Sequence, residues 1–133
     1  MLIKDGVVGG VELCRRTLTG KCEPDRIADA LAEMKSLRVA AKHPDALVIG
    51  CDQVLAHNRA ILSKPETPAD ALAKLKALRG ETHQLLSAAV IYADGKPQWR
   101  HVGQTRLFMR DVSDAYLTDY VDRNWDSIRH SVG

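Results

Sequence analysis

The feature that most constrains this fold is an amphipathic helix that leads directly into a short apolar run. Between residues 25 and 42, apolar side chains recur at helical spacing, at Ile27, Leu31, Met34 and Ala41. The run Leu47–Cys51 follows, and its β-branched residues are typical of a strand buried on both faces. A helix with one apolar stripe needs such a sheet to pack against, so the pair predicts an α/β fold.

The rest of the chain extends this pattern. Thr67 followed by Pro68 predicts the start of a second helix, and Gly80 predicts its end. Further elements are expected at Ala60–Leu62 (short strand), Thr82–Ala93 and Gln98–Arg110 (strands joined by a turn) and from Ser113 onward (helix). This order predicts one α/β domain over residues 1–133, with a mixed sheet and flanking helices.

Composition excludes several classes of protein. The 133 residues carry a net charge of only +2 with scattered basic side chains, which argues against a nucleic-acid partner. Three cysteines without a C-x-x-C pair suggest neither a disulfide framework nor a zinc site, so a reducing cytoplasm is expected. The sequence shows neither a signal-peptide pattern nor an apolar run of membrane-spanning length, so no membrane association is expected.

Asp52 is the first candidate for chemistry. It follows a predicted buried strand, and α/β sheets bind ligands at the carboxyl ends of their strands, although a turn or helix-capping aspartate would look the same. Lys35 and Lys64 each suit a solvated surface position. Together with Asp52 they would also suit a site in which ammonium groups neutralise phosphate and the carboxylate binds a divalent ion.

Two other kinds of active site are not supported. Ser87, His83 and Asp52 have the side chains of a hydrolase triad, but no G-x-S-x-G motif surrounds Ser87. The five histidines lack H-E-x-x-H or similar spacing, which argues against a zinc enzyme.

Five linked motifs in order resemble the Maf family of nucleoside triphosphate pyrophosphatases. They are L-A-x-x-K ending at Lys35, an apolar strand ending in G-x-D-Q-V at Val54, the dipeptide Lys64-Pro65, the helical pair Ala71-Leu72, and G-x-x-H ending at His83. The resemblance covers most of the chain.

The resemblance implies a Maf-like architecture, related to the inosine-triphosphate pyrophosphatases, and hydrolysis of a nucleoside triphosphate to monophosphate and diphosphate with Mg²⁺ or Mn²⁺. By position, Asp52 would be the catalytic carboxylate and metal ligand, while Lys35 and Lys64 would bind the triphosphate. Gln53 would contact the base or ribose, because a D-Q pair resembles the branch acting on 7-methylguanosine triphosphate. A homodimer is among the expected partners.

The chain departs from the family at both ends. Residues 1–23 match poorly and lack the S-x-S-x-R-R motif; Cys14-Arg15-Arg16 resembles only its end, and Glu12 is a weak match for the family's second acid. After Gly133 a further part of the family fold is expected, so the chain looks truncated at both ends. One alternative is therefore a catalytically impaired nucleotide-binding or regulatory module, and another is an interaction domain with no ligand.

Overall fold

The computed structural model describes residues 23–132, which form two compact units. Within that range, unit 1 contains residues 23–54 and 86–104, and unit 2 contains residues 55–85 and 105–132. The N-terminal residues singled out from the sequence lie outside the described part, namely Glu12, Cys14, Arg15 and Arg16. The single domain over residues 1–133 stays a prediction.

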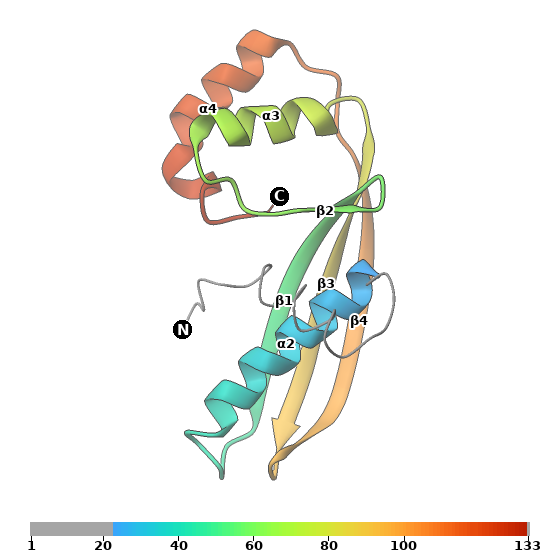
Figure 1. Cartoon of the computed structure of the whole chain (residues 1–133), viewed down its shortest axis with the longest axis vertical. Coiled ribbons are helices and arrows are strands. Elements are labelled where there is room, and N and C mark those ends of the chain that lie inside the picture. The colour runs from blue at the N-terminus through green and yellow to red at the C-terminus, as the bar shows by residue number, and fades with distance from the viewer. Residues whose placement is uncertain (1–22, 133) are drawn as a thin grey trace. The chain divides into compact units, whose positions relative to one another are not determined.

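The described strands form one sheet in the order β2-β1-β3-β4 (Figure 1). Their bounds are β1 Val48–His57, β2 Ala60–Leu62, β3 Thr82–Ala93 and β4 Lys96–Phe108. The α/β class is confirmed, and the described strands pair antiparallel where a mixed sheet was expected. Two-residue turns join β1 to β2 and β3 to β4, and such short connections allow only antiparallel neighbours.

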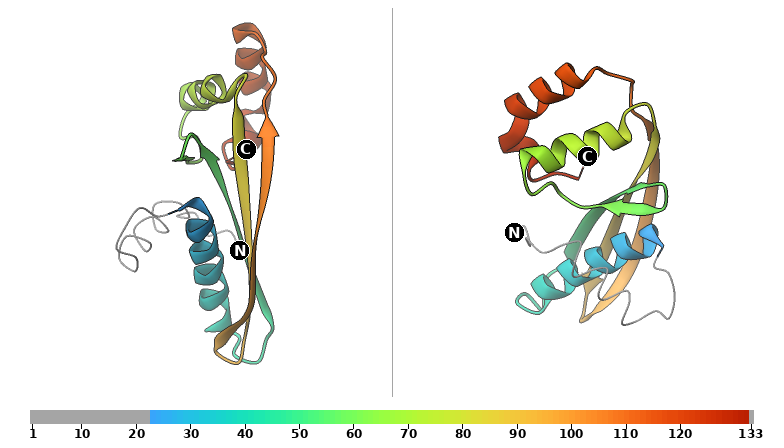
Figure 2. Two further views of the ribbon diagram at one scale, coloured as in Figure 1. Left: turned by 90° about the vertical axis from the view of Figure 1, so that its right-hand side faces the viewer. Right: turned by 45° about the horizontal axis from the view of Figure 1, so that its top comes forward.

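Helix α2 (Pro24–Ala40) belongs to unit 1 and confirms the first predicted helix. Pro24 occupies its first turn, where the missing N–H costs nothing, and Asp25 lies near the positive end of the helix dipole. The buried residues share one stripe, formed by Ile27, Ala28, Leu31, Ala32 and Ser36. Figure 2 shows this helix lying along one face of the strands of unit 1.

Strand β1 corrects the expectation of a strand buried on both faces. Val48 and Gly50 are buried toward α2, whereas Leu47 and Ile49 are 68% and 61% exposed. The described part of unit 1 has a helix on only one face of the sheet, so apolar side chains on the other face stay exposed. An apolar run therefore predicted the strand correctly but not its burial.

Both hairpin turns use left-handed backbone conformations, which the residue type suits at every central position except Arg59. Asn58 and Arg59 have φ of 49° and 65° between β1 and β2, and Asp94 and Gly95 have φ of 52° and 74° between β3 and β4. Positive φ at two central residues gives a turn whose twist matches the flanking strands, and asparagine, aspartate and glycine tolerate it best. The turn that the sequence predicts between these strands is confirmed at Asp94 and Gly95, and β4 begins at Lys96, two residues before the expected Gln98.

Unit 2 contains α3 (Pro68–Leu78) and α4 (Asp114–Ile128), which pack against each other. The cap predicted at Thr67 is present, because its hydroxyl accepts a hydrogen bond from the Asp70 amide; at the predicted helix start Ser113, the hydroxyl likewise accepts one from the Tyr116 amide. Gly80 has a φ of 69° just past α3, as a helix stop requires. Across residues 23–132, no helix combines the length and apolar character needed to cross a bilayer.

Candidate functional site

The structure brings Lys35 and Asp52 together. Lys35 extends from α2, and its ammonium donates to the Asp52 carboxylate on β1 and to the Cys51 carbonyl, at 3.1 Å. The Lys35 and Asp52 side chains are 26% and 12% exposed, so the ion pair is largely shielded but not sealed from solvent. We refer to these two side chains as the Lys35–Asp52 pair.

Gly50 and Ser36 explain why α2 lies close enough to form this pair. A Cβ atom on Gly50 would lie 2.1 Å from the Ser36 hydroxyl oxygen and 2.3 Å from the Ala32 carbonyl oxygen. The buried Ser36 hydroxyl lies 3.0 Å from that carbonyl and 3.1 Å from the Val90 carbonyl of β3. Lys35 precedes Ser36 in the helix, so this contact fixes the position along β1 at which the Lys35 side chain reaches the strand.

Sequence reasoning missed the role of Ser36. The available signal was the recurrence of small residues at every fourth position of α2, at Ala28, Ala32 and Ser36. Such spacing places them on one face of a helix and allows a close backbone approach. A serine in that row reads equally well as a surface residue, so sequence alone could not identify its partner.

Gln53 does not join the Lys35–Asp52 pair. Adjacent residues of a strand point to opposite faces of the sheet, and Asp52 is directed toward α2. The Gln53 amide instead donates to the Ser87 hydroxyl on β3, at 2.9 Å. Its predicted contact with the base or ribose stays a prediction.

Lys64 belongs to unit 2, in the segment between β2 and α3. Its side chain is exposed, and no residue in the described range forms a hydrogen bond or ion pair with its ammonium group. Its backbone carbonyl, by contrast, accepts a hydrogen bond from Lys74, at 3.2 Å. Lys64 therefore combines an anchored backbone with a side chain open to an anionic ligand.

The groups around Asp52 can be compared with those that the divalent metal implied by the family resemblance would need as ligands. No cluster of three or more His, Cys, Asp or Glu side chains suited to a metal ion occurs in residues 23–132. Mg²⁺ commonly binds through one or two carboxylates and completes its shell with substrate phosphates and water. Lys35 donates to Oδ1 of Asp52, and no described residue donates to Oδ2. The Oδ2 atom is therefore available as the single protein ligand of such an ion.

His83, the last residue of the matched motifs, is buried in unit 2. Only 9% of its surface is exposed, and its Nδ1 atom has no hydrogen-bond partner among residues 23–132. Burial lowers the pKa of the imidazole below its usual value of 6.5, and the charge of nearby His57 lowers the pKa further. A neutral histidine in this setting suits packing better than proton transfer to a ligand.

Comparison with known proteins agrees with the motifs. The family described as Maf-like protein matches residues 10–131. A nucleoside triphosphate pyrophosphatase of Ruegeria pomeroyi is 58% identical over 123 residues, which are 92% of this chain and 62% of the relative. One of Roseobacter denitrificans is 62% identical over 116 residues, covering 87% of this chain and 58% of the relative.

A third relative, the 7-methyl-GTP pyrophosphatase of Brucella abortus, is 42% identical over 110 residues, which are 83% of this chain and 55% of the relative. The chain thus spans about three fifths of the length of the curated relatives it matches.

Proposed function

From the premise that this chain belongs to the Maf-like protein family, we propose that it hydrolyses a nucleoside triphosphate to a nucleoside monophosphate and diphosphate. The names of the relatives support this reaction. The observation that carries it to particular residues is the Lys35–Asp52 pair, in which a shielded carboxylate is oriented by an ammonium group.

The proposed reaction has a simple balance. The oxygen of a water molecule forms a bond to the α-phosphorus, the bond from that phosphorus to the bridging oxygen breaks, and diphosphate leaves. Asp52 would orient the water and accept its proton, a role that typically accelerates a reaction by about 10² to 10⁴-fold. Lys35 would hold the carboxylate in place, and Lys64 would neutralise phosphate charge.

As an alternative role for the same carboxylate, we propose Asp52 as the protein ligand of a divalent cation, Mg²⁺ or Mn²⁺, with substrate phosphates and water as the other ligands. When bound, such an ion would neutralise charge on the phosphate oxygens. This assignment is supported by the one carboxylate oxygen that Lys35 leaves open.

For the substrate we propose 7-methylguanosine triphosphate. The name of the Brucella abortus relative and the D-Q pair at Asp52-Gln53 support this choice. For Gln53 to contact the nucleotide, its amide would exchange the Ser87 hydroxyl for a ligand atom. We further propose a cytoplasmic enzyme, with a homodimer as the expected assembly.

The test is diphosphate release from a panel of canonical and methylated nucleoside triphosphates with Mg²⁺ or Mn²⁺. The variant Asp52→Asn should lower kcat by about a hundredfold or more, since it removes the proposed base. Asp45→Asn is the matched control, because Asp45 is an exposed carboxylate of unit 1 and its loss should leave kcat unchanged. Saturable nucleotide binding without diphosphate release would refute hydrolysis and favour a nucleotide-binding module.

A further inference from the structure

The segment that carries Lys64 is held by side chains that none of the matched motifs includes. This segment, Ser63–Glu66, links β2 to α3 and is called the K-P segment below. The ammonium of Lys74, on α3, donates to the Ser63 hydroxyl at 3.4 Å and to the Lys64 carbonyl at 3.2 Å. One side chain therefore bonds two successive residues of the segment.

Asp70 completes the attachment. Its carboxylate accepts from the Lys74 ammonium at 2.7 Å and from the Glu66 amide at 3.0 Å. These two bonds lower the pKa of the Asp70 carboxyl, the Lys74 bond contributing most. The K-P segment is thus bonded on both sides of Pro65, to Lys74 before it and to Asp70 after it.

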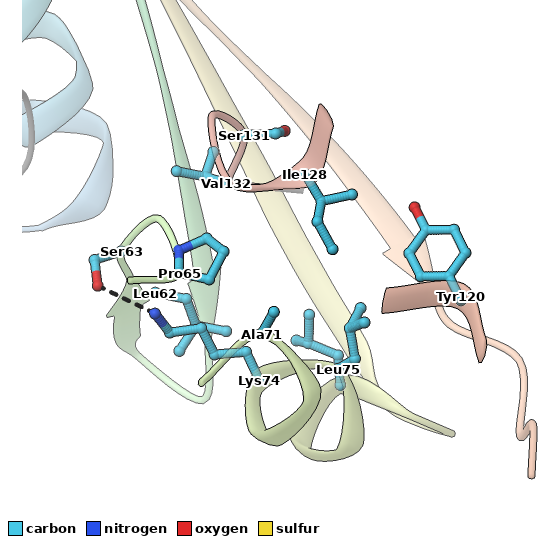
Figure 3. Close-up of a pocket in the computed structure, with 11 residues that line it drawn as sticks. Leu62, Ser63, Pro65, Ala71, Lys74, Leu75, Tyr120, Ile128, Ser131 and Val132 are labelled. Atoms are coloured by element: carbon cyan, nitrogen blue, oxygen red, sulfur yellow. Dashed lines mark hydrogen bonds between the residues drawn. The ribbon is translucent and has the colours of Figure 1, made fainter. Parts of the chain in front are cut away.

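The proline ring adds a third restraint on the segment. Pro65 lines an apolar cavity of ≈ 90 Å³, together with Ala71 and Leu75 of α3 (Figure 3). The proline ring restricts the residue before it to extended backbone conformations, which limits Lys64 directly. The hydrogen bonds to Lys74 and Asp70 and the proline geometry together define the direction in which the Lys64 side chain leaves the chain.

We propose that Lys74 and Asp70 form a positioning pair that holds the K-P segment so that the Lys64 ammonium meets the phosphates of a bound nucleoside triphosphate. This inference rests on the proposed function, because it assigns the anion that Lys64 binds. A lysine side chain loses considerable rotamer freedom on binding, so fixing its backbone in advance lowers the cost of that binding.

The chain supplies a matched control on the same helix. Lys76 also forms an ion pair, to Asp114 at 2.8 Å, but has no bond to the K-P segment. Lys76→Met therefore removes an equal charge and an ion pair while leaving Lys64 held. Lys74→Met keeps the aliphatic stem that lines the cavity, so it removes the bonds with little loss of packing.

The experiment measures the Kd of a nucleoside triphosphate analogue with a methylene group between its α- and β-phosphorus atoms. Lys74→Met and Asp70→Ala should each raise Kd about tenfold through displacement of Lys64, while Lys76→Met should leave it unchanged. Lys74→Arg, which retains charge and donors, should recover binding. Circular dichroism at the assay temperature checks that each variant is folded.

Two comparisons separate positioning from charge alone. Loss of the Asp70 charge near an anion site should tighten binding by simple electrostatics, so a tighter complex of Asp70→Ala would overturn the proposal. In a Lys64→Met background, Lys74→Met and Asp70→Ala should change Kd by about twofold or less, because the group they position is gone. An undiminished effect in that background would also overturn it.

The outcomes distinguish this inference from the function on which it rests. If the wild-type chain binds no analogue, the proposed function fails and the inference fails with it. If the wild type binds and Lys64→Met weakens binding, but Lys74→Met and Asp70→Ala bind like the wild type, only the positioning role fails.

Discussion

Replacing Gly50 with alanine should separate α2 from β1. The added Cβ atom would lie 2.1 Å from the Ser36 hydroxyl oxygen, 2.3 Å from the Ala32 carbonyl oxygen and 2.7 Å from the Ser36 amide nitrogen. Carbon contacts are normally about 3.5 Å or longer, so the helix must move by about 1 Å. Two of the three atoms belong to the helix backbone, so a side-chain rotation cannot relieve the overlap.

The cost follows from that displacement. Overpacking typically destabilises a core by about 1–3 kcal/mol, and contacts with backbone atoms favour the upper end of this range. With a urea m value of about 1.5 kcal/mol per molar, a loss of about 3 kcal/mol lowers the unfolding midpoint by about 2 M. The same movement would pull Lys35 from Asp52, so the kcat of the proposed hydrolysis should fall by more than the loss of folded protein alone would cause.

Gly103→Ala is the matched control, because Gly103 also lies on a strand of unit 1. The nearest atoms to its added Cβ are 3.9 Å away, at His101 Nε2 and the Ser87 carbonyl oxygen. Alanine should therefore leave stability unchanged or raise it by up to about 1 kcal/mol. Urea titration followed by circular dichroism measures both variants. Equal midpoints for Gly50→Ala and the wild type would refute the close approach of α2.

Three further predictions concern stability. Ser36→Ala should lower the free energy of unfolding in urea by about 1 kcal/mol, since it removes the hydrogen bonding of the buried hydroxyl. An unchanged free energy would mean that this hydrogen bonding makes no net contribution to stability. Because the pKa of folded His83 lies below 6.5, the unfolded chain binds the proton more readily, so the urea midpoint should fall as pH drops through 6.5 toward the lower pKa of the folded state. His83→Gln should flatten that dependence, and an unchanged slope would contradict it. Leu55→Ala should cost about 2–5 kcal/mol, because Leu55 is 1% exposed in the core; a loss below about 1 kcal/mol would argue against that burial.

Local signals in the sequence predicted the elements well. The caps at Thr67 and Ser113 and the glycine after α3 act within one or two turns of the chain, so their residue types suffice to place helix ends. The hairpin at Asp94-Gly95 is local in the same sense. Burial of Leu47 and Ile49 depends instead on what covers the second face of the sheet, and no pattern inside the strand contains that information.

The candidate site shows the same division. The resemblance singled out Lys35 and Asp52, and the structure joins them, but the spacing of two residues in sequence does not predict an ion pair between helix and strand. Strand periodicity alone would have placed Gln53 on the face opposite Asp52. Lys74 carried no signal, because a lysine in the middle of a helix usually faces solvent and its bond to Lys64 arises only after folding.

The absence of a side chain at Gly50 also fixes the register of β1 against α2. Strand residues alternate between faces, so sliding β1 by a single position would turn Ile49 or Cys51 toward α2, where not even a methyl group fits. The same slip would present Gln53 or Cys51 to Lys35 in place of the carboxylate. A misaligned strand would therefore overlap sterically with α2 as well as lose the carboxylate opposite Lys35. The requirement for glycine at this one position thus favours the register in which Lys35 pairs with Asp52.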